Sequence, residues 1–261
     1  MNKPSTKLKE HHLGWKVPTL EVFSTADRLF QRVAKDFSKI ANQSVLETGK
    51  FIVALSGGTT PKRLYEILGT TRFRQLIPWK QTYVIWSDER HVPRTSPQSN
   101  FKMAWEALLS KVPVASNHIL KMTDGKGSVA QKAIQYEKKM RKLLASQPMD
   151  LVLLGMGEDG HTASLFPGKQ ERLEAQKWVI GYFVDEEKRE RISLTFPLLN
   201  QAKRIWVLIE GDKKSQMLAK VLEDSKRKYP IQHLNPTQGQ LVFKVDVAAA
   251  SQLRNKYFIS K

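Results

Sequence analysis

The chain has 261 residues, of which 41% are apolar, and it contains no cysteine. This length allows one large core or two small ones, and we expect a single α/β domain. The absence of cysteine excludes disulfides, thiol catalysis and cysteine zinc sites, and it fits a reducing compartment. Because the sequence has no apolar run long enough to span a bilayer and no apolar segment behind a basic N-terminus, we expect a cytoplasmic protein with no membrane partner.

The formal net charge is +18, which is typical of proteins that bind nucleic acid. However, lysine and arginine are spread along the whole chain, with only short clusters at residues 138–142 and 226–228. We therefore expect solvated helix and loop faces rather than a nucleic-acid surface. A positive field would also attract a small anionic metabolite.

Apolar or β-branched runs alternate with segments of helical periodicity, which predicts an α/β protein with a largely parallel sheet. In chain order, we expect a helix over 26–40, a strand over 51–55, a helix with Pro61 near its start, a strand over 83–86, helices over 99–109 and 129–145, strands over 150–154, 178–184, 191–195 and 205–209, a helix over 213–222, a strand over 241–245 and a helix over 248–256. Residues 1–16, rich in Lys and His, are expected to form a flexible tail before a domain over 17–261.

Three polar segments begin where an apolar strand run stops, namely residues 56–60, 87–90 and 155–161. Open α/β sheets bind ligands in the crevice outside the carboxyl ends of their strands. We therefore expect these three segments to meet at one pocket.

The first of these segments, Ser56-Gly-Gly-Thr-Thr60, leads from a strand into a helix. Glycine amides, hydroxyls and a helix start favour a bound anion, although a plain tight turn would use the same residues. The Gly-Lys-Ser/Thr ending of a Walker loop is missing. Arg90, Arg191 and Lys214, each at the boundary of an expected element, are candidate cations to complete the site, with a surface role as the alternative for each.

The third segment begins with Gly-Met-Gly-Glu-Asp-Gly, which matches the dinucleotide pattern Gly-x-Gly-x-x-Gly. Pro167 follows too early for the crossover helix of that fingerprint, and the acidic residue expected about 20 positions later is missing. The segment is better explained as a glycine-lined loop that carries Asp159 and His161. A neutral imidazole can take a proton from water, and a nearby carboxylate can fix its tautomer, although a lone loop histidine is often structural.

Two other kinds of catalytic site find no support in the sequence. The six histidines are scattered without ligand spacing, so we expect no metal. A Gly-x-Ser-x-Gly elbow is missing as well, so a serine-hydrolase nucleophile cannot be named.

Four segments in order resemble the motifs of the 6-phosphogluconolactonase family. They are Leu55-Ser-Gly-Gly-Thr-Thr-Pro61, Trp86-Ser-Asp-Glu-Arg-His-Val-Pro93 followed by Ser99-Asn100, Gly155-Met-Gly-Glu-Asp-Gly-His-Thr-Ala-Ser-Leu-Phe-Pro-Gly168, and Arg191-Ile-Ser-Leu-Thr-Phe-Pro197. The resemblance runs from about residue 20 to residue 250.

This resemblance implies a single Rossmann-like α/β domain of the glucosamine-6-phosphate deaminase type, with a mostly parallel sheet flanked by helices and no metal or organic cofactor. It implies hydrolysis of 6-phospho-D-glucono-1,5-lactone to 6-phospho-D-gluconate in the oxidative pentose phosphate pathway. His161 would be the general base, with Asp159 beside it. The residues expected to bind substrate are Ser56, Gly57, Gly58, Thr59, Asp88, Arg90, Asn100, Gly157, Arg191 and Lys214. We expect a monomer or weak homodimer with no nucleic-acid partner.

Two alternatives stay open. Glucosamine-6-phosphate deaminase has a similar Asp-Gly-His loop, but there a segment resembling Phe-Asn-Glu-Pro follows with a carboxylate, whereas Ser164-Leu-Phe-Pro167 has none. The other alternative is a non-catalytic protein that binds a sugar phosphate or nucleic acid. A sugar-phosphate sensor would keep the turn at 56–59 and Arg90 but would not need Asp159 beside His161.

Overall fold

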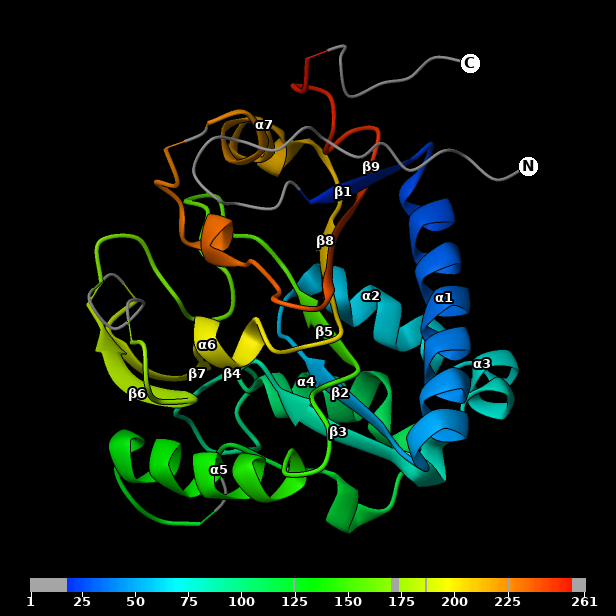
Figure 1. The fold of residues 1–261 in the computed structure, drawn as a ribbon, viewed down its shortest axis with the longest axis vertical. Coiled ribbons are helices and arrows are strands. Elements are labelled where there is room, and N and C mark those ends of the chain that lie inside the picture. The colour runs from blue at the N-terminus through cyan, green and yellow to red at the C-terminus, as the bar shows by residue number, and fades with distance from the viewer. Residues whose placement is uncertain (1–17, 124, 170–173, 186, 225, 255–261) are drawn as a thin grey trace.

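Six parallel strands form the larger of two sheets in the computed structural model, which describes residues 18–123, 125–169, 174–185, 187–224 and 226–254 (Figure 1). Their spatial order is β1 (Thr19–Phe23), β9 (Gln240–Asp246), β8 (Arg204–Ile209), β5 (Leu151–Leu154), β2 (Phe51–Leu55) and β3 (Thr82–Trp86). The central strands β2 and β5 are buried at every residue, as expected for parallel strands covered on both faces. The predicted α/β class with a mostly parallel sheet is therefore confirmed, although β1 was not predicted.

A second sheet is antiparallel and has the order β4 (Asp88–Arg90), β7 (Arg189–Leu194) and β6 (Val179–Val184). The strands expected near 178–184 and 191–195 therefore exist but do not join the parallel sheet. Only residues 185–188 connect β6 to β7, and a parallel crossover needs a dozen or more residues. Arg191 consequently lies inside β7, which corrects the expectation that it lies at a strand boundary.

Helices flank the large sheet and cover one face of the small one (Figure 1). They are α1 (Ala26–Thr48), α2 (Thr59–Leu68), α3 (Thr71–Leu76), α4 (Asn100–Ala107), α5 (Val129–Leu143), α6 (Phe196–Leu199) and α7 (Ser215–Glu223), with short 3-10 turns at η1 (Trp79–Gln81), η2 (Leu109–Lys111), η3 (Ser116–His118), η5 (Asp212–Lys214) and η6 (Pro230–His233). Helix α1 packs on β1, β2 and β9, while α5 packs on β6 and β7. Within the described ranges, no helix has the length and apolarity needed to cross a bilayer.

Local sequence explains where the longer helices start and stop. Thr25 caps α1 by accepting the amide of Arg28, and Gly49 ends it in a left-handed conformation. Ser128 and Gln131 form a capping box at the start of α5. The apolar face of α1 reaches the core through Phe37, whose ring meets that of Phe51 edge to face at 5.3 Å.

The helix expected over 248–256 is wrong for the residues that are described. From residue 247 to 253 the chain forms successive turns instead, with short-range bonds such as Leu253 N to Ala250 O at 3.0 Å. The carboxylate of Asp246 accepts the amide of Ala249 at 2.8 Å, which offers this backbone an alternative to a helical ladder. The expected tail over 1–16 lies outside the described residues.

The chain leaves the large sheet at the carboxyl ends of β2, β3, β5 and β8, which are adjacent strands. Because these strands are parallel, the segments that follow them meet at one edge of the sheet. These segments are 56–60, 87–90, 155–161 and 210–214. The first three are the polar segments predicted to converge, and the fourth adds Lys214.

Candidate active site

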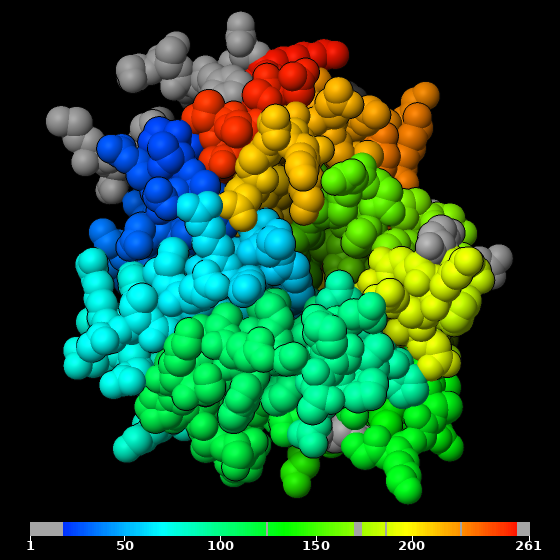
Figure 2. Space-filling view, turned by 180° about the vertical axis from the view of Figure 1, so that it is seen from behind, coloured from blue at the N-terminus to red at the C-terminus, as the bar shows by residue number. Residues whose placement is uncertain are grey.

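A cavity of about 350 Å³ lies at this edge of the sheet. In Figure 2 the surface is hollowed where the cyan, green and gold parts of the chain meet. His161 lines the cavity. So do all the residues predicted to bind substrate, which are Ser56, Gly57, Gly58, Thr59, Asp88, Arg90, Asn100, Gly157, Arg191 and Lys214. Asp159 does not line the cavity but contacts His161. The structure therefore brings the predicted set together, while the role of each residue stays a prediction.

The lining also contains residues that sequence reasoning missed. They are Thr60, Pro61, Gly155, Met156, Glu158, Thr162, Ala163, Phe166 and Glu187. All but one of them lie inside the motifs at residues 55–61 and 155–168, so treating every residue of these motifs as a candidate would have found them. Glu187 is the exception, because it belongs to the β6–β7 connection and nothing in its local sequence points to a cavity.

His161 and Asp159 form a hydrogen-bonded pair in the loop after β5. Nδ1 of His161 lies 2.6 Å from Oδ1 of Asp159, and the backbone amide of His161 donates to the same oxygen at 3.0 Å. A carboxylate partner places the ring proton on Nδ1 and leaves Nε2 able to accept a proton. Partial burial acts to raise the pKa of Asp159, but the hydrogen bond and charge of His161 outweigh it and lower that pKa below its usual value. The carboxylate is therefore ionised at neutral pH.

Glycines make the tight geometry of this loop possible. A Cβ atom on Gly157 would overlap both the ring of His161 and the carboxylate of Asp159. The amide of Gly157 donates to the carbonyl of His161 at 2.9 Å, and Gly160, with φ of 80°, donates to Gly157 O at 3.1 Å. The Gly-x-Gly-x-x-Gly pattern thus serves a compact His–Asp loop rather than a dinucleotide.

Ser56, the first residue of the turn between β2 and α2, fixes this turn by hydrogen bonds to the protein interior. The hydroxyl of Ser56 donates to Leu153 O at 2.8 Å, and its amide donates to the hydroxyl of the buried Tyr65 at 3.0 Å. The donors of Ser56 are therefore engaged within the protein. Further along, the amides of Thr59 and Thr60 belong to the first turn of α2, where a helix supplies no acceptors. Both residues line the cavity, and amides at a helix start suit an anion.

Three cations line the cavity, and their surroundings differ. Arg191 is buried and contacts Glu187, with its Nη1 also 3.8 Å from Oδ2 of Asp88. Arg90 donates through Nη1 to Asn100 Oδ1 and, at 3.1 Å, to Gln98 O. Both guanidinium groups are thus fixed in place by neighbouring oxygens.

Lys214 is the third cation. Among the described parts of the chain, its ammonium has no ion-pair partner within 4.0 Å. Burial lowers its pKa below the ordinary value of 10.5, while the charges of Glu158 and Glu210 oppose this effect. The donors of Lys214 are accordingly available to a ligand. Arg90 also keeps a donor for a ligand, because its Nε is buried without a hydrogen-bond partner among the described residues.

Asp88 and Asn100 join the segments around the cavity. Oδ2 of Asp88 accepts the hydroxyl of Ser164 at 2.6 Å, and Nδ2 of Asn100 donates to the carbonyl of Asp88 at 2.9 Å. A Cβ atom on Gly57 would overlap the side chain of Asn100, so Gly57 lets this side chain lie directly on the turn after β2. These contacts connect three loops that are far apart in sequence.

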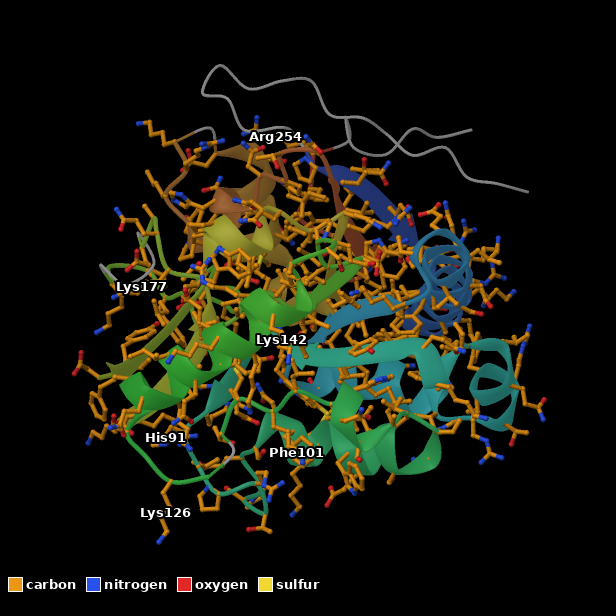
Figure 3. The ribbon with its side chains drawn as sticks, turned by 60° about the horizontal axis from the view of Figure 1, so that its bottom comes forward. His91, Phe101, Lys126, Lys142, Lys177 and Arg254 are labelled. Carbon is orange, nitrogen blue, oxygen red and sulfur yellow. The ribbon has the colours of Figure 1, made fainter. Side chains whose placement is uncertain are left out.

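Four basic side chains labelled in Figure 3, those of Lys126, Lys142, Lys177 and Arg254, come from separate parts of the fold. As for metals, the described residues hold no group of three His, Asp or Glu side chains placed to bind an ion.

A parallel sheet with a polar cavity at its carboxyl edge, lined by a histidine that pairs with an aspartate, defines the class of this protein as an α/β enzyme with a metabolite-sized site. Residues 24–243 match the family model described as glucosamine-6-phosphate isomerases/6-phosphogluconolactonase. The chain belongs to this family, which confirms the resemblance seen in its motifs.

Individual relatives agree with this assignment. A 6-phosphogluconolactonase from Nostoc sp. is 34% identical over 242 residues, covering 90% of this chain and 98% of the relative. The structure of 6-phosphogluconolactonase from Trypanosoma cruzi is similar with a TM-score of 0.81 and 29% identity, covering 94% of this chain and 99% of that one. A monomeric glucosamine-6-phosphate deaminase, at 18% identity and a TM-score of 0.77 over 89% of this chain and 99% of its own, shares the fold.

Proposed function

We propose that this chain hydrolyses 6-phospho-D-glucono-1,5-lactone to 6-phospho-D-gluconate, as in the oxidative pentose phosphate pathway. The observation that carries the proposal is that His161 and the turn at residues 56–60 line the same cavity of about 350 Å³. A proton acceptor and an anion site can therefore act on the two ends of one small molecule. Relatives named 6-phosphogluconolactonase, 32–34% identical over about nine tenths of this chain, support this substrate.

In this proposal, Nε2 of His161 removes a proton from water as the water oxygen bonds to C1 of the lactone. Asp159 stabilises the imidazolium that forms, because its ionised carboxylate accepts a hydrogen bond from the protonated Nδ1. The C1–ring oxygen bond then breaks, and the imidazolium returns its proton to the departing oxygen. General base catalysis contributes roughly 10²–10⁴-fold, which suffices for a lactone that already opens slowly in water.

The phosphate end orients the substrate. The amides of Thr59 and Thr60, the ammonium of Lys214 and Nε of Arg90 are the donors that we assign to the phosphate. Fixing the phosphate several bonds away from C1 holds the carbonyl near His161 and lowers the entropic cost of the reaction.

Few backbone amides near His161 can donate a hydrogen bond to the C1 oxygen. Within the loop after β5, the amides of Gly157, Gly160 and His161 already have acceptors inside the protein. These three amides are therefore not available to a developing oxyanion.

We also propose that residues 17–261 work as one domain and that a monomer or weak homodimer is active. Loops that follow the large sheet and strands of the small sheet, all from one chain, line the cavity. A cytoplasmic location fits the lack of cysteine in the sequence. The spread of basic residues along the whole sequence supports the absence of a nucleic-acid partner.

The test is a proton-release assay with freshly generated 6-phosphogluconolactone at neutral pH, with spontaneous opening subtracted. The proposal predicts enzyme-dependent acid formation that saturates with lactone concentration and a much weaker effect on unphosphorylated gluconolactone. Ammonia release from glucosamine 6-phosphate, measured in parallel, would favour the deaminase instead. The loop after His161 lacks the carboxylate of the deaminase pattern, so we expect no ammonia.

A further inference from the structure

Glu89 lies between two residues of the cavity but faces away from it. Asp88 and Arg90 line the cavity, whereas Glu89 does not and is only 2% exposed. We propose that Glu89 is a positioning residue, which holds the first turn of α4 against β4 and thereby sets Asn100 and Arg90 at the phosphate end of the cavity. The inference rests on the proposed function, because its effect is expected on the binding of a phosphorylated ligand.

Four donors converge on the Glu89 carboxylate. Oε1 accepts the amides of Asn100 at 2.7 Å and Arg90 at 2.8 Å. Oε2 accepts the amide of Phe101 at 2.8 Å and the hydroxyl of Ser99 at 3.0 Å. Four donors at once match the acceptor sites of a carboxylate. Burial and the charge of Asp88 raise the pKa of Glu89, whereas the backbone hydrogen bonds from Phe101, Asn100 and Arg90 favour its ionised form.

These bonds join two segments that the sequence separates by ten residues. In Figure 3, His91 marks the chain just after β4, and Phe101 marks the first turn of α4. The carboxylate of Glu89 bonds on one side to the backbone of β4 and on the other to the start of α4. It therefore fixes the distance between the two segments.

The position of the α4 backbone decides where the side chain of Asn100 lies. This side chain is fully enclosed, with the residue 1% exposed, and its Oδ1 accepts Nη1 of Arg90. Its Nδ2 donates to the carbonyl of Asp88, and its other neighbour is Gly57, where a Cβ atom would overlap it. A shift of the first turn of α4 would thus move the guanidinium of Arg90 relative to the turn after β2.

A matched control exists at the opposite edge of the sheet. Asp150 is also fully buried, and its carboxylate accepts the amide of Ile52 at 2.8 Å and bonds to Lys203 at 2.8 Å. It lies just before β5, at the amino ends of the strands, and does not line the cavity. Asp150→Asn therefore removes another buried, hydrogen-bonded carboxylate and leaves the contacts among Glu89, Asn100 and Arg90 unchanged.

The experiment compares Glu89→Gln, Asn100→Ala, the double variant and Asp150→Asn. Titration calorimetry measures the affinity for 6-phosphogluconate and inorganic phosphate, and steady-state assays measure kcat and KM for the lactone. A glutamine can accept on one oxygen only, so we expect Glu89→Gln to weaken ligand affinity and raise KM by about tenfold, as for one charge-assisted hydrogen bond, with kcat changed less than about threefold. The double variant should bind the two ligands no more weakly than Asn100→Ala alone, because Glu89 acts on Arg90 through Asn100.

The inference is overturned if Glu89→Gln lowers the melting temperature but leaves affinity unchanged, if Asp150→Asn weakens affinity equally, or if the double variant shows additive losses. Should Glu89→Gln not fold, Ser99→Ala removes one of the four donors, with Ser128→Ala at the cap of α5 as its control. A wild-type protein that binds phosphate but does not turn over the lactone would contradict the proposed function alone. Failure to bind either ligand would contradict both.

Discussion

His161 and Asp159 are linked twice through a single oxygen atom, because Oδ1 of Asp159 accepts both the ring Nδ1 at 2.6 Å and the backbone amide of His161 at 3.0 Å. The ring also packs on Phe166, with centroids 4.4 Å apart. The imidazole is therefore fixed relative to its own backbone before any ligand arrives. Such preorganisation is what a general base needs to act on a water molecule in one defined direction.

Replacing His161 by alanine should lower kcat by about 10²–10⁴-fold, the contribution typical of general base catalysis. The affinity for 6-phosphogluconate should change little, since the phosphate donors are elsewhere. His91→Ala is the matched control, because His91 also pairs with a carboxylate, Glu190, at 2.6 Å but does not line the cavity. Assays with spontaneous opening subtracted should show normal kcat for His91→Ala. Equal kcat in His161→Ala and wild type would remove His161 from the mechanism.

Alanine at Gly157 should damage catalysis without removing a functional group. Its Cβ would push the ring of His161 and the carboxylate of Asp159 apart, and misplacement by about 1 Å costs up to about 10²-fold in rate. Gly155→Ala in the same loop meets no atom within 4 Å, so it should reduce kcat far less. Steady-state kinetics with melting temperatures would check this, and equal losses in both variants would contradict the geometry.

Alanine at Gly57 should act on binding instead. The added Cβ displaces Asn100 from its place on the turn after β2, and with it the guanidinium of Arg90. We expect KM to rise by roughly tenfold with a smaller change in kcat, because the loss concerns a charged contact away from C1. A fall in kcat at unchanged KM would show that this turn does not belong to the phosphate end.

Lys214 should take up a proton when a phosphorylated ligand binds. Burial lowers its pKa in the free protein, and a bound dianion raises it again. Between these two pKa values, binding draws in protons, so affinity falls as the pH rises through the pKa of the free protein. Calorimetry of 6-phosphogluconate binding in two buffers of different ionisation enthalpy measures this uptake. Lys214→Met should abolish it and the exposed neighbour variant Lys213→Met should not, whereas uptake in Lys214→Met would assign the proton to another group.

The sequence predicts the large sheet because its strands are apolar and buried on both faces, as in Phe51–Leu55. It also predicts where the site forms, because polar loops after parallel strands meet at one edge. Strand β4 could not be found in this way. Its residues, Asp88–Arg90, carry no apolar signal and become a strand only by pairing with β7, for example Glu89 with Ile192.

Other features could not be predicted from the sequence because they depend on contacts between side chains and distant or neighbouring backbone groups. Glu89 reaches the start of α4 ten or more residues away, so this contact does not follow from local pattern. Glu187 bonds to Arg191 only four residues later, but its place at the cavity depends on how the small sheet packs. The residues after β9 have high helix propensity, but Asp246 bonds to the amide of Ala249 and the chain turns instead. Propensity and motif thus identify the elements and their loops, while the contacts among buried polar groups require the structure.

The most direct test of the proposed mechanism is a crystal structure of the protein with 6-phosphogluconate bound. We expect the phosphate at the amides of Thr59 and Thr60 and the ammonium of Lys214, with a carboxylate oxygen about 2.6–3.2 Å from Nε2 of His161. A ligand bound in the reverse orientation, with its phosphate at His161, or a ligand outside the cavity would contradict it.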